Sequence, residues 1–118
     1  MICLPSSIFI VIKKLLRMDE FGLPDGVLSS IAGVIASIGS VKRAAIYGSR
    51  AKGSYRPNSD IDIMLYGDSI TLSDLANIDC RLDDLLLPWQ IDLTARCRVS
   101  SPTLLDEVDR WGKTFFKR

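Results

Sequence analysis

Residues 48–67 read GSRAKGSYRPNSDIDIMLYG, and the second half of this stretch decides the fold. The letters DIDIMLY at 60–66 alternate polar and apolar residues before they become continuously apolar, which predicts a half-buried strand. Side chains two apart in a strand point to the same face, so Asp60 and Asp62 share one face, about 6.7 Å apart. Aspartate is depleted from strands, and burying a carboxylate without a partner is costly. The pair therefore predicts a compensating positive charge at this end of the strand.

A second predicted strand carries a similar aspartate. Residues 89–94 read WQIDLT and alternate again, with Ile91 and Leu93 facing inward and Asp92 facing outward. If this strand lies beside the first, three carboxylates come close together and repel one another unless a cation lies between them. Carboxylate oxygens are ligands for hard ions such as Mg²⁺ or Mn²⁺. A single aspartate at a strand edge is ordinarily solvated, but the matching strands favour a metal site.

Three amphipathic helices are predicted around these strands. The first follows the start signal PDG at 24–26 and ends at Gly39, and the second begins at Thr71, with Thr71 or Ser73 as its cap, and ends at Pro88. The third runs from Pro102 to the C-terminal aromatic residues. Its apolar face, which we predict to be core in preference to a surface for docking a partner, contains Leu104, Leu105, Val108, Trp111, Phe115 and Phe116.

The other elements complete a small domain. Residues 44–47 read AAIY and predict a strand, 49–53 predict a short helical turn, and 56–59 predict a loop. The order of elements is therefore helix, strand, turn, strand, helix, strand, helix. This order predicts an α/β or α+β domain, with a small mixed sheet backed by helices on one face.

Composition limits the classes of function. The 118 residues are 47% hydrophobic, which predicts one domain with a real core. The chain includes no histidine, so histidine triads and histidine-ligated metals are excluded. A net charge of +1 argues against a dedicated nucleic-acid binder, so no stable nucleic-acid binding is expected. The three cysteines lack metal-ligand spacing, which favours free thiols in a reducing cytoplasm.

The first seventeen residues, MICLPSSIFIVIKKLLR, do not resemble a secretory signal. Their apolar run, residues 8–12, is short, and the positive charges follow it instead of preceding it. No run approaches the roughly 18 apolar residues of a membrane span, so no membrane association is expected. We predict that residues 1–17 are an N-terminal extension dispensable for the fold, and that the domain comprises residues 18–118.

The glycine-serine turn before the first aspartate strand suits an anion. Gly48 permits a tight exit from the preceding strand, and Ser49 lies where backbone amides and a hydroxyl can face a phosphate. The turn is not a Walker A loop, because Ser54 and Tyr55 stand where that motif needs Lys and Ser or Thr. A calcium-binding EF-hand loop is excluded as well, because apolar residues replace its oxygen ligands.

Gly48-Ser49, ten residues, and then Asp60-Ile61-Asp62 form the pattern GS-x10-DxD. On this pattern the chain resembles the DNA polymerase β-like nucleotidyltransferases, and within them the minimal nucleotidyltransferase (MNT) family, the MntA-type antitoxins of HEPN/MNT toxin–antitoxin pairs. The resemblance runs from about Gly22 to the C-terminus and includes PWQIDL and the terminal helix. It implies the nucleotidyltransferase fold.

The resemblance also implies roles for particular residues. Asp60 and Asp62 would bind two Mg²⁺ ions, or Mn²⁺, with Asp92 as the third carboxylate. Gly48 and Ser49 would hold the triphosphate of ATP. As neighbours of the motif, two basic residues are expected to contact phosphate, namely Arg50 and Lys52, whereas the role of Arg56 is left open.

The implied reaction transfers AMP from ATP to an acceptor hydroxyl and releases pyrophosphate, with Asp92 helping to deprotonate the acceptor. The resemblance points to a tyrosine of a HEPN-family toxin as the acceptor, so the protein would act as an antitoxin. Two alternatives stay open: an antitoxin that neutralises its partner by binding alone, and transfer to a small molecule. So small a domain is expected to complete its acceptor site with a partner or a second subunit, as a homo- or hetero-oligomer.

Overall fold

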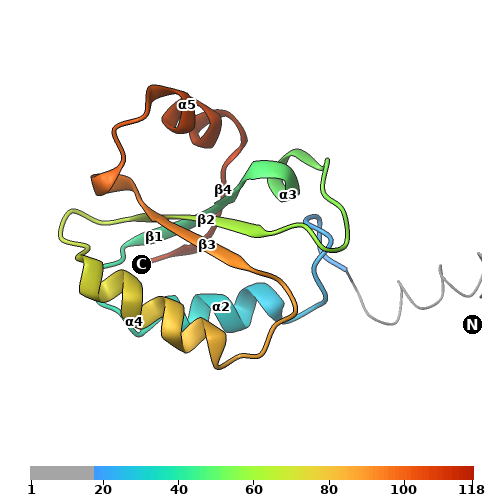
Figure 1. The fold of residues 1–118 in the computed structure, drawn as a ribbon, viewed down its shortest axis with the longest axis horizontal. Helices are drawn as coiled ribbons and strands as arrows, with labels where there is room; N and C mark the ends of the chain where they lie inside the picture. The colour runs from blue at the N-terminus through green and yellow to red at the C-terminus, as the bar shows by residue number, and fades with distance from the viewer. Residues whose placement is uncertain (1–17) are drawn as a thin grey trace, which may run out of the picture.

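The computed structural model describes residues 18–118 (Figure 1), so the predicted extension 1–17 lies outside the described residues. Four helices, four strands and one 3₁₀ turn follow one another along this part of the chain. Their bounds in chain order are α2 Val27–Ala36, β1 Arg43–Tyr47, α3 Gly48–Lys52, β2 Ile61–Tyr66, α4 Leu72–Asp83, β3 Ile91–Ala95, η1 Arg96–Arg98, α5 Pro102–Trp111 and β4 Lys113–Lys117.

The sheet is small and mixed, as the sequence predicts. Its strand order is β3-β2-β1-β4, with β2 parallel to β3 and β1 antiparallel to both β2 and β4. The helix α4 connects the two parallel strands, which is the crossover that parallel pairing requires. The fold is therefore the α+β arrangement that the order of elements indicates.

The fourth strand corrects the sequence analysis, which placed Phe115 and Phe116 on the last helix. α5 ends at Trp111, and residues 113–117 pair antiparallel with β1. Gly112 makes this change of direction possible, because a Cβ at this position would lie 2.5 Å from the carbonyl oxygen of Val108. The strand then suits a run of β-formers, and both phenylalanines pack against the core.

The core lies between the sheet and the pair of long helices, α2 and α4, which back one face as expected (Figure 1). Fully buried side chains from α2, α4 and the strands meet there, among them Ile31, Ile35, Ile46, Ile63 and Ile78. The opposite face is also covered in part, because Val108 of α5 packs on Met64 and Tyr47. Trp111, which the sequence analysis counted as core, is instead 47% exposed.

The helix α4 begins as predicted and ends earlier. Thr71 caps it with a capping box, accepting from the Asp74 amide at 3.0 Å while the Asp74 carboxylate accepts from the Thr71 amide at 3.1 Å. It stops at Asp83 instead of reaching Pro88. Acidic residues oppose the negative end of the helix dipole, and Pro88 disfavours helical backbone at the residue before it. The following turn holds Leu86 at a φ of 54°.

Candidate active site

Strand pairing brings the aspartates of two strands into one row. In the parallel ladder Asp62 of β2 lies opposite Asp92 of β3, and in the antiparallel ladder Asp62 lies opposite Tyr47 of β1. Asp60 directly precedes β2 and is exposed. Asp62 and Asp92 therefore lie side by side at one end of the sheet, on the face that α5 partly covers, and Asp60 is near enough for its charge to act on Asp62.

Asp62 occupies the centre of this row, and its environment opposes ionisation. Burial, together with the negative charges of Asp92 and Asp60, raises the pKa of the Asp62 carboxyl from its usual 3.8 to about 6. Glu107 of α5 adds to the same effect. A cation at this position would remove the repulsion that the three carboxylates and Glu107 exert on one another.

Gly48 meets a requirement that no other residue satisfies. Its φ is 73°, and a Cβ built on it would lie 2.2 Å from Oδ2 of Asp62. The backbone of the glycine-serine turn therefore runs directly against the central carboxylate. Ser49 follows in α3 and is partly exposed, beside the same carboxylate row.

Arg50 does not take the place that the sequence analysis assigned to it. The side chain is only 1% exposed, and its guanidinium donates hydrogen bonds to the carbonyl oxygens of Phe21 at 2.8 Å, Ser59 at 2.9 Å and Pro57 at 3.3 Å. A guanidinium directed to three carbonyls inside the protein is not available to a phosphate. Arg50 instead ties α3 to the residue before Asp60, so it supports the loop from which the DxD pair emerges.

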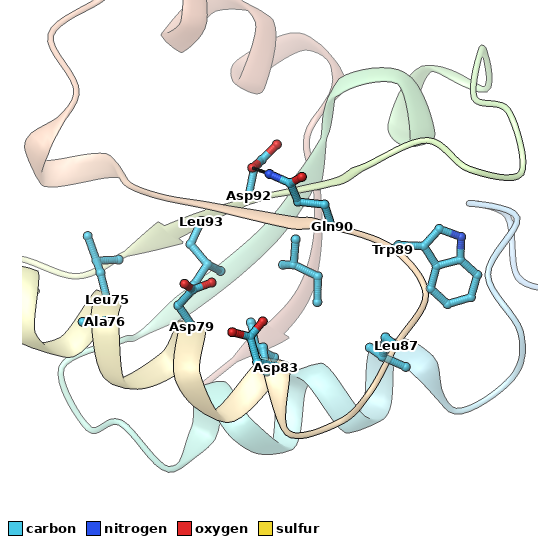
Figure 2. A pocket seen from close by; sticks show the side chains of 11 residues that line it. Leu75, Ala76, Asp79, Asp83, Leu87, Trp89, Gln90, Asp92 and Leu93 are labelled. Atoms are coloured by element: carbon cyan, nitrogen blue, oxygen red, sulfur yellow. Dashed lines mark hydrogen bonds between the residues drawn. The ribbon is translucent and has the colours of Figure 1, made fainter.

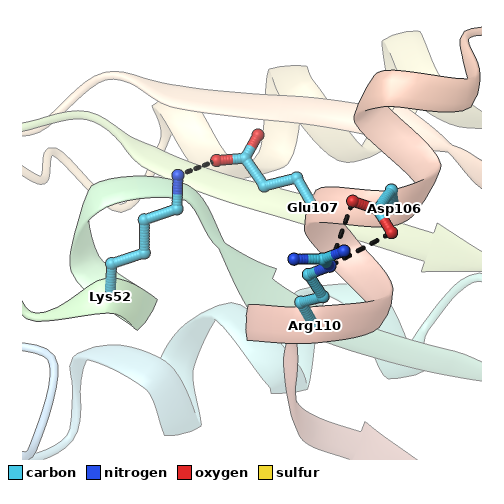
Figure 3. Close-up of polar contacts among 4 residues, drawn as sticks. All are labelled: Lys52, Asp106, Glu107 and Arg110. Carbon is cyan, nitrogen blue, oxygen red and sulfur yellow. Dashed lines mark hydrogen bonds and ion pairs between the residues drawn. The ribbon is translucent and has the colours of Figure 1, made fainter.

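Lys52 lies at the surface and is paired. Its ammonium forms an ion pair with the carboxylate of Glu107, which joins α3 to α5 beside the site (Figure 3). The two side chains are about one-third exposed, so solvent screens the pair and it can open. A second pair on α5, Arg110 with Asp106 at 3.1 Å, is more exposed and lies within one helix.

Two residues at the site were missed by sequence reasoning. Tyr47 looked like an ordinary strand residue, but its hydroxyl lies 3.4 Å from Oγ1 of Thr94, and burial raises the pKa of the phenol. Glu107 lies 45 residues after Asp62 in the chain, with no motif around it. The amphipathic spacing of α5 placed Val108 toward the sheet, and only a known position for that helix could have indicated Glu107.

The donor set fits a hard divalent cation. Among residues 18–118, no three acidic or thiol side chains are already gathered closely enough to chelate an ion. Nevertheless Asp60, Asp62 and Asp92 offer only oxygen donors, which Mg²⁺ and Mn²⁺ prefer, and a bound cation would lower the raised pKa of Asp62. No helix within residues 18–118 is long and apolar enough to span a membrane.

A mixed sheet with acidic side chains at one end, beside a glycine-serine turn, is the arrangement of a nucleotidyltransferase domain. The chain belongs to the family described as polymerase beta, nucleotidyltransferase, whose family model matches residues 30–118. No curated protein matches the sequence.

Solved structures share the fold at low identity. One, described as a toxin–antitoxin with AMP-PNP, is 22% identical with a TM-score of 0.64, and the match covers 78% of this chain and 74% of that one. The toxin–antitoxin MntA-HepT is 22% identical over 77% and 70% of the two chains, with a TM-score of 0.57. A complex of tri-AMPylated Shewanella oneidensis HEPN toxin with MNT antitoxin is 18% identical over 78% and 74%, with a TM-score of 0.53.

Proposed function

We propose that the protein is a metal-dependent nucleotidyltransferase that moves AMP from ATP to a tyrosine hydroxyl of a HEPN-family toxin, and thereby acts as an antitoxin. The observation that carries the proposal is the register that sets Asp62 beside Asp92, with Gly48 against the central carboxylate. Three mutually repelling carboxylates destabilise the free domain, and a role in binding a cation explains why they stand together.

Each residue of the site has a role in this reaction. Asp60, Asp62 and Asp92 would hold Mg²⁺, or Mn²⁺ in its place, as two ions that neutralise phosphate charge and polarise the α-phosphate when bound. Gly48 and Ser49 would hold the triphosphate by backbone amides and a hydroxyl. Arg50 acts only on the position of the loop before Asp60, because its side chain is buried.

The transfer itself forms one bond and breaks one bond. The acceptor oxygen attacks the α-phosphorus of ATP, the bond to the β-phosphate oxygen breaks, and pyrophosphate leaves. Asp92, on the strand next to Asp62, would take the proton of the acceptor hydroxyl, a role that its pairing with Asp62 supports. Lys52 becomes free to contact the leaving phosphates when its exposed ion pair with Glu107 opens.

We infer the partner from the complexes in which chains of the same fold occur. Chains of the same fold occur in complexes described as toxin–antitoxin with AMP-PNP and as tri-AMPylated HEPN toxin with MNT antitoxin. We extend both the nucleotide and the acceptor class to this protein.

The test uses the full chain, Mg²⁺, α-labelled ATP and the HEPN-domain protein encoded beside it. We expect a mass gain of one AMP on a tyrosine of the partner, reduced about 10²–10³-fold by Asp62→Asn or Asp92→Asn. Asp68→Asn, an exposed aspartate of the turn after β2, is the matched control and should leave the rate unchanged.

Two outcomes would contradict the proposal. If the partner is neutralised equally well by wild type and Asp62→Asn, contact alone explains the antitoxin activity. If pyrophosphate is released without modification of the partner, the acceptor is a small molecule.

A further inference from the structure

An open cleft lies between α4 and β3, the strand at the edge of the sheet. It measures about 580 Å³, within the range of ligand sites in proteins. Figure 2 shows side chains of α4 and β3 lining it, with Trp89 at one end. Apolar side chains line it, among them Leu75, Leu87, Trp89, Ile91 and Leu93, while polar atoms make up the larger part of its exposed lining.

The strand that borders this cleft has a free edge among the residues that the structure describes. β3 is the outermost strand and pairs only with β2. The carbonyl of Gln90 accepts from the Ile61 amide at 2.9 Å, so Gln90 and, by alternation, Asp92 direct their backbone groups to β2. The amides and carbonyls of Ile91 and Leu93 therefore point outward. Such an edge is a template for another strand.

The rim of the cleft is acidic. Asp79 and Asp83 lie one turn apart on α4 and point into the opening (Figure 2). No lysine or arginine lines the cleft, and the nearby Arg81 donates to Ser37 of the neighbouring helix at 2.7 Å. Just beyond the end of α4, Leu86 has left-handed backbone and is 89% exposed.

We infer that this cleft and the free edge of β3 bind an extended segment of the acceptor protein, which adds to the sheet as a strand. The inference rests on the proposed function and names the substrate class of the same site. Main-chain hydrogen bonds to Ile91 and Leu93 provide the pairing, and alternate side chains of the segment enter the cleft. Lysine or arginine at the ends of the segment meets Asp79 and Asp83.

The alternation of a strand then specifies the acceptor residue. Side chains of the added strand that do not enter the cleft lie on the other face of the sheet, the face of Asp92. A tyrosine there presents its hydroxyl to the carboxylate row. We therefore expect the segment to contain a tyrosine between two apolar residues, with a basic residue two positions farther out on each side.

A labelled peptide tests the charge requirement without nucleotide or metal. The probe is Lys-Thr-Val-Tyr-Val-Thr-Lys, compared by fluorescence anisotropy with the same peptide carrying glutamate in place of both lysines, in EDTA. We expect the basic peptide to bind the full chain about tenfold tighter. The double variant Asp79→Lys/Asp83→Lys should reverse this preference. Lysine near the end of a helix suits its dipole, so this variant should fold.

Backbone methylation tests the strand pairing with the protein unchanged. One peptide is N-methylated at both valines and another at the tyrosine and the following threonine, because alternate amides face β3. We expect only one of the two to lose about tenfold in affinity. Equal effects of both methylation patterns, or a charge preference that the double variant leaves in place, would overturn the inference.

Failure of the inference and failure of the proposed function give different results. If the peptide binds with these preferences and ATP with Mg²⁺ never modifies it or the HEPN partner, the docking surface stands and the proposed reaction is wrong. If AMP is transferred to tyrosine at a rate that does not change when the charges at Asp79 and Asp83 are reversed, the reaction stands and the docking inference is wrong.

Discussion

Replacing Asp62 by asparagine should make the metal-free protein more stable while it removes activity. Asparagine has nearly the same shape as aspartate and carries no charge, so it ends the repulsion by Asp92, Asp60 and Glu107. Its amide can also donate a hydrogen bond to a neighbouring carboxylate, which the ionised aspartate cannot do. The substitution therefore separates the effect of the carboxylates on the stability of the metal-free protein from their effect on activity.

The magnitude follows from the pKa of Asp62. A rise from 3.8 to about 6 corresponds to at most about 3 kcal/mol at neutral pH, since one pKa unit equals about 1.4 kcal/mol. Asp62 is only half-buried, and solvent screening reduces this to about 1–1.5 kcal/mol. Because the folded protein holds the proton more tightly than the unfolded chain, the contribution of the protonated group to stability is complete below pH 3.8. It is lost as the pH rises through about 6.

The assay is urea unfolding in EDTA at pH 4 and pH 7. We expect Asp62→Asn to exceed wild type in free energy of unfolding by about 1–1.5 kcal/mol at pH 7, with a smaller difference at pH 4. Asp68→Asn serves as the control for removing one exposed negative charge. A variant that is equal to wild type or less stable at pH 7 would refute the reasoning that the carboxylates repel one another in the free domain.

Three further experiments test the structural roles of residues around the site. Gly48→Ala should lower the free energy of unfolding, measured by chemical denaturation, by about 1–2 kcal/mol for its positive φ and by a further amount for the collision of its Cβ. Gly53→Ala, at φ 81° with nothing within 4 Å, should show only the loss due to φ. Arg50→Met should destabilise by about 2–4 kcal/mol, because it leaves the carbonyls of Phe21 and Ser59 without a donor, whereas Pro57 keeps the indole of Trp89; an unchanged denaturation midpoint would contradict this. A double-mutant cycle on Lys52→Met and Glu107→Gln should give a coupling below about 1 kcal/mol that weakens with salt, and a larger coupling would show that the pair is firmly closed.

Local patterns predicted a large part of the fold. The alternation in 60–66 and 89–94 predicted β2 and β3 within two residues of their observed ends, and Thr71, one of the two candidate caps, marked the start of α4. These predictions succeeded because a strand or a helix start depends on residues that are adjacent in the chain. The C-terminal strand was missed since its apolar spacing also fits a helix, and pairing with β1 decided between the two.

At the site, the same physical reason separates what the sequence predicted from what only the tertiary structure decided. From the sequence alone came the shared face of Asp60 and Asp62 and the need for glycine at 48, because both depend on backbone geometry over a few residues. The tertiary structure decided how strands and helices pair across long separations. It set Asp92 directly beside Asp62, buried Arg50 among carbonyls where a phosphate contact had been expected, and brought an acidic helix side chain to the site. Burial and charge repulsion depend on distances in space, and the order of residues along the chain does not contain those distances.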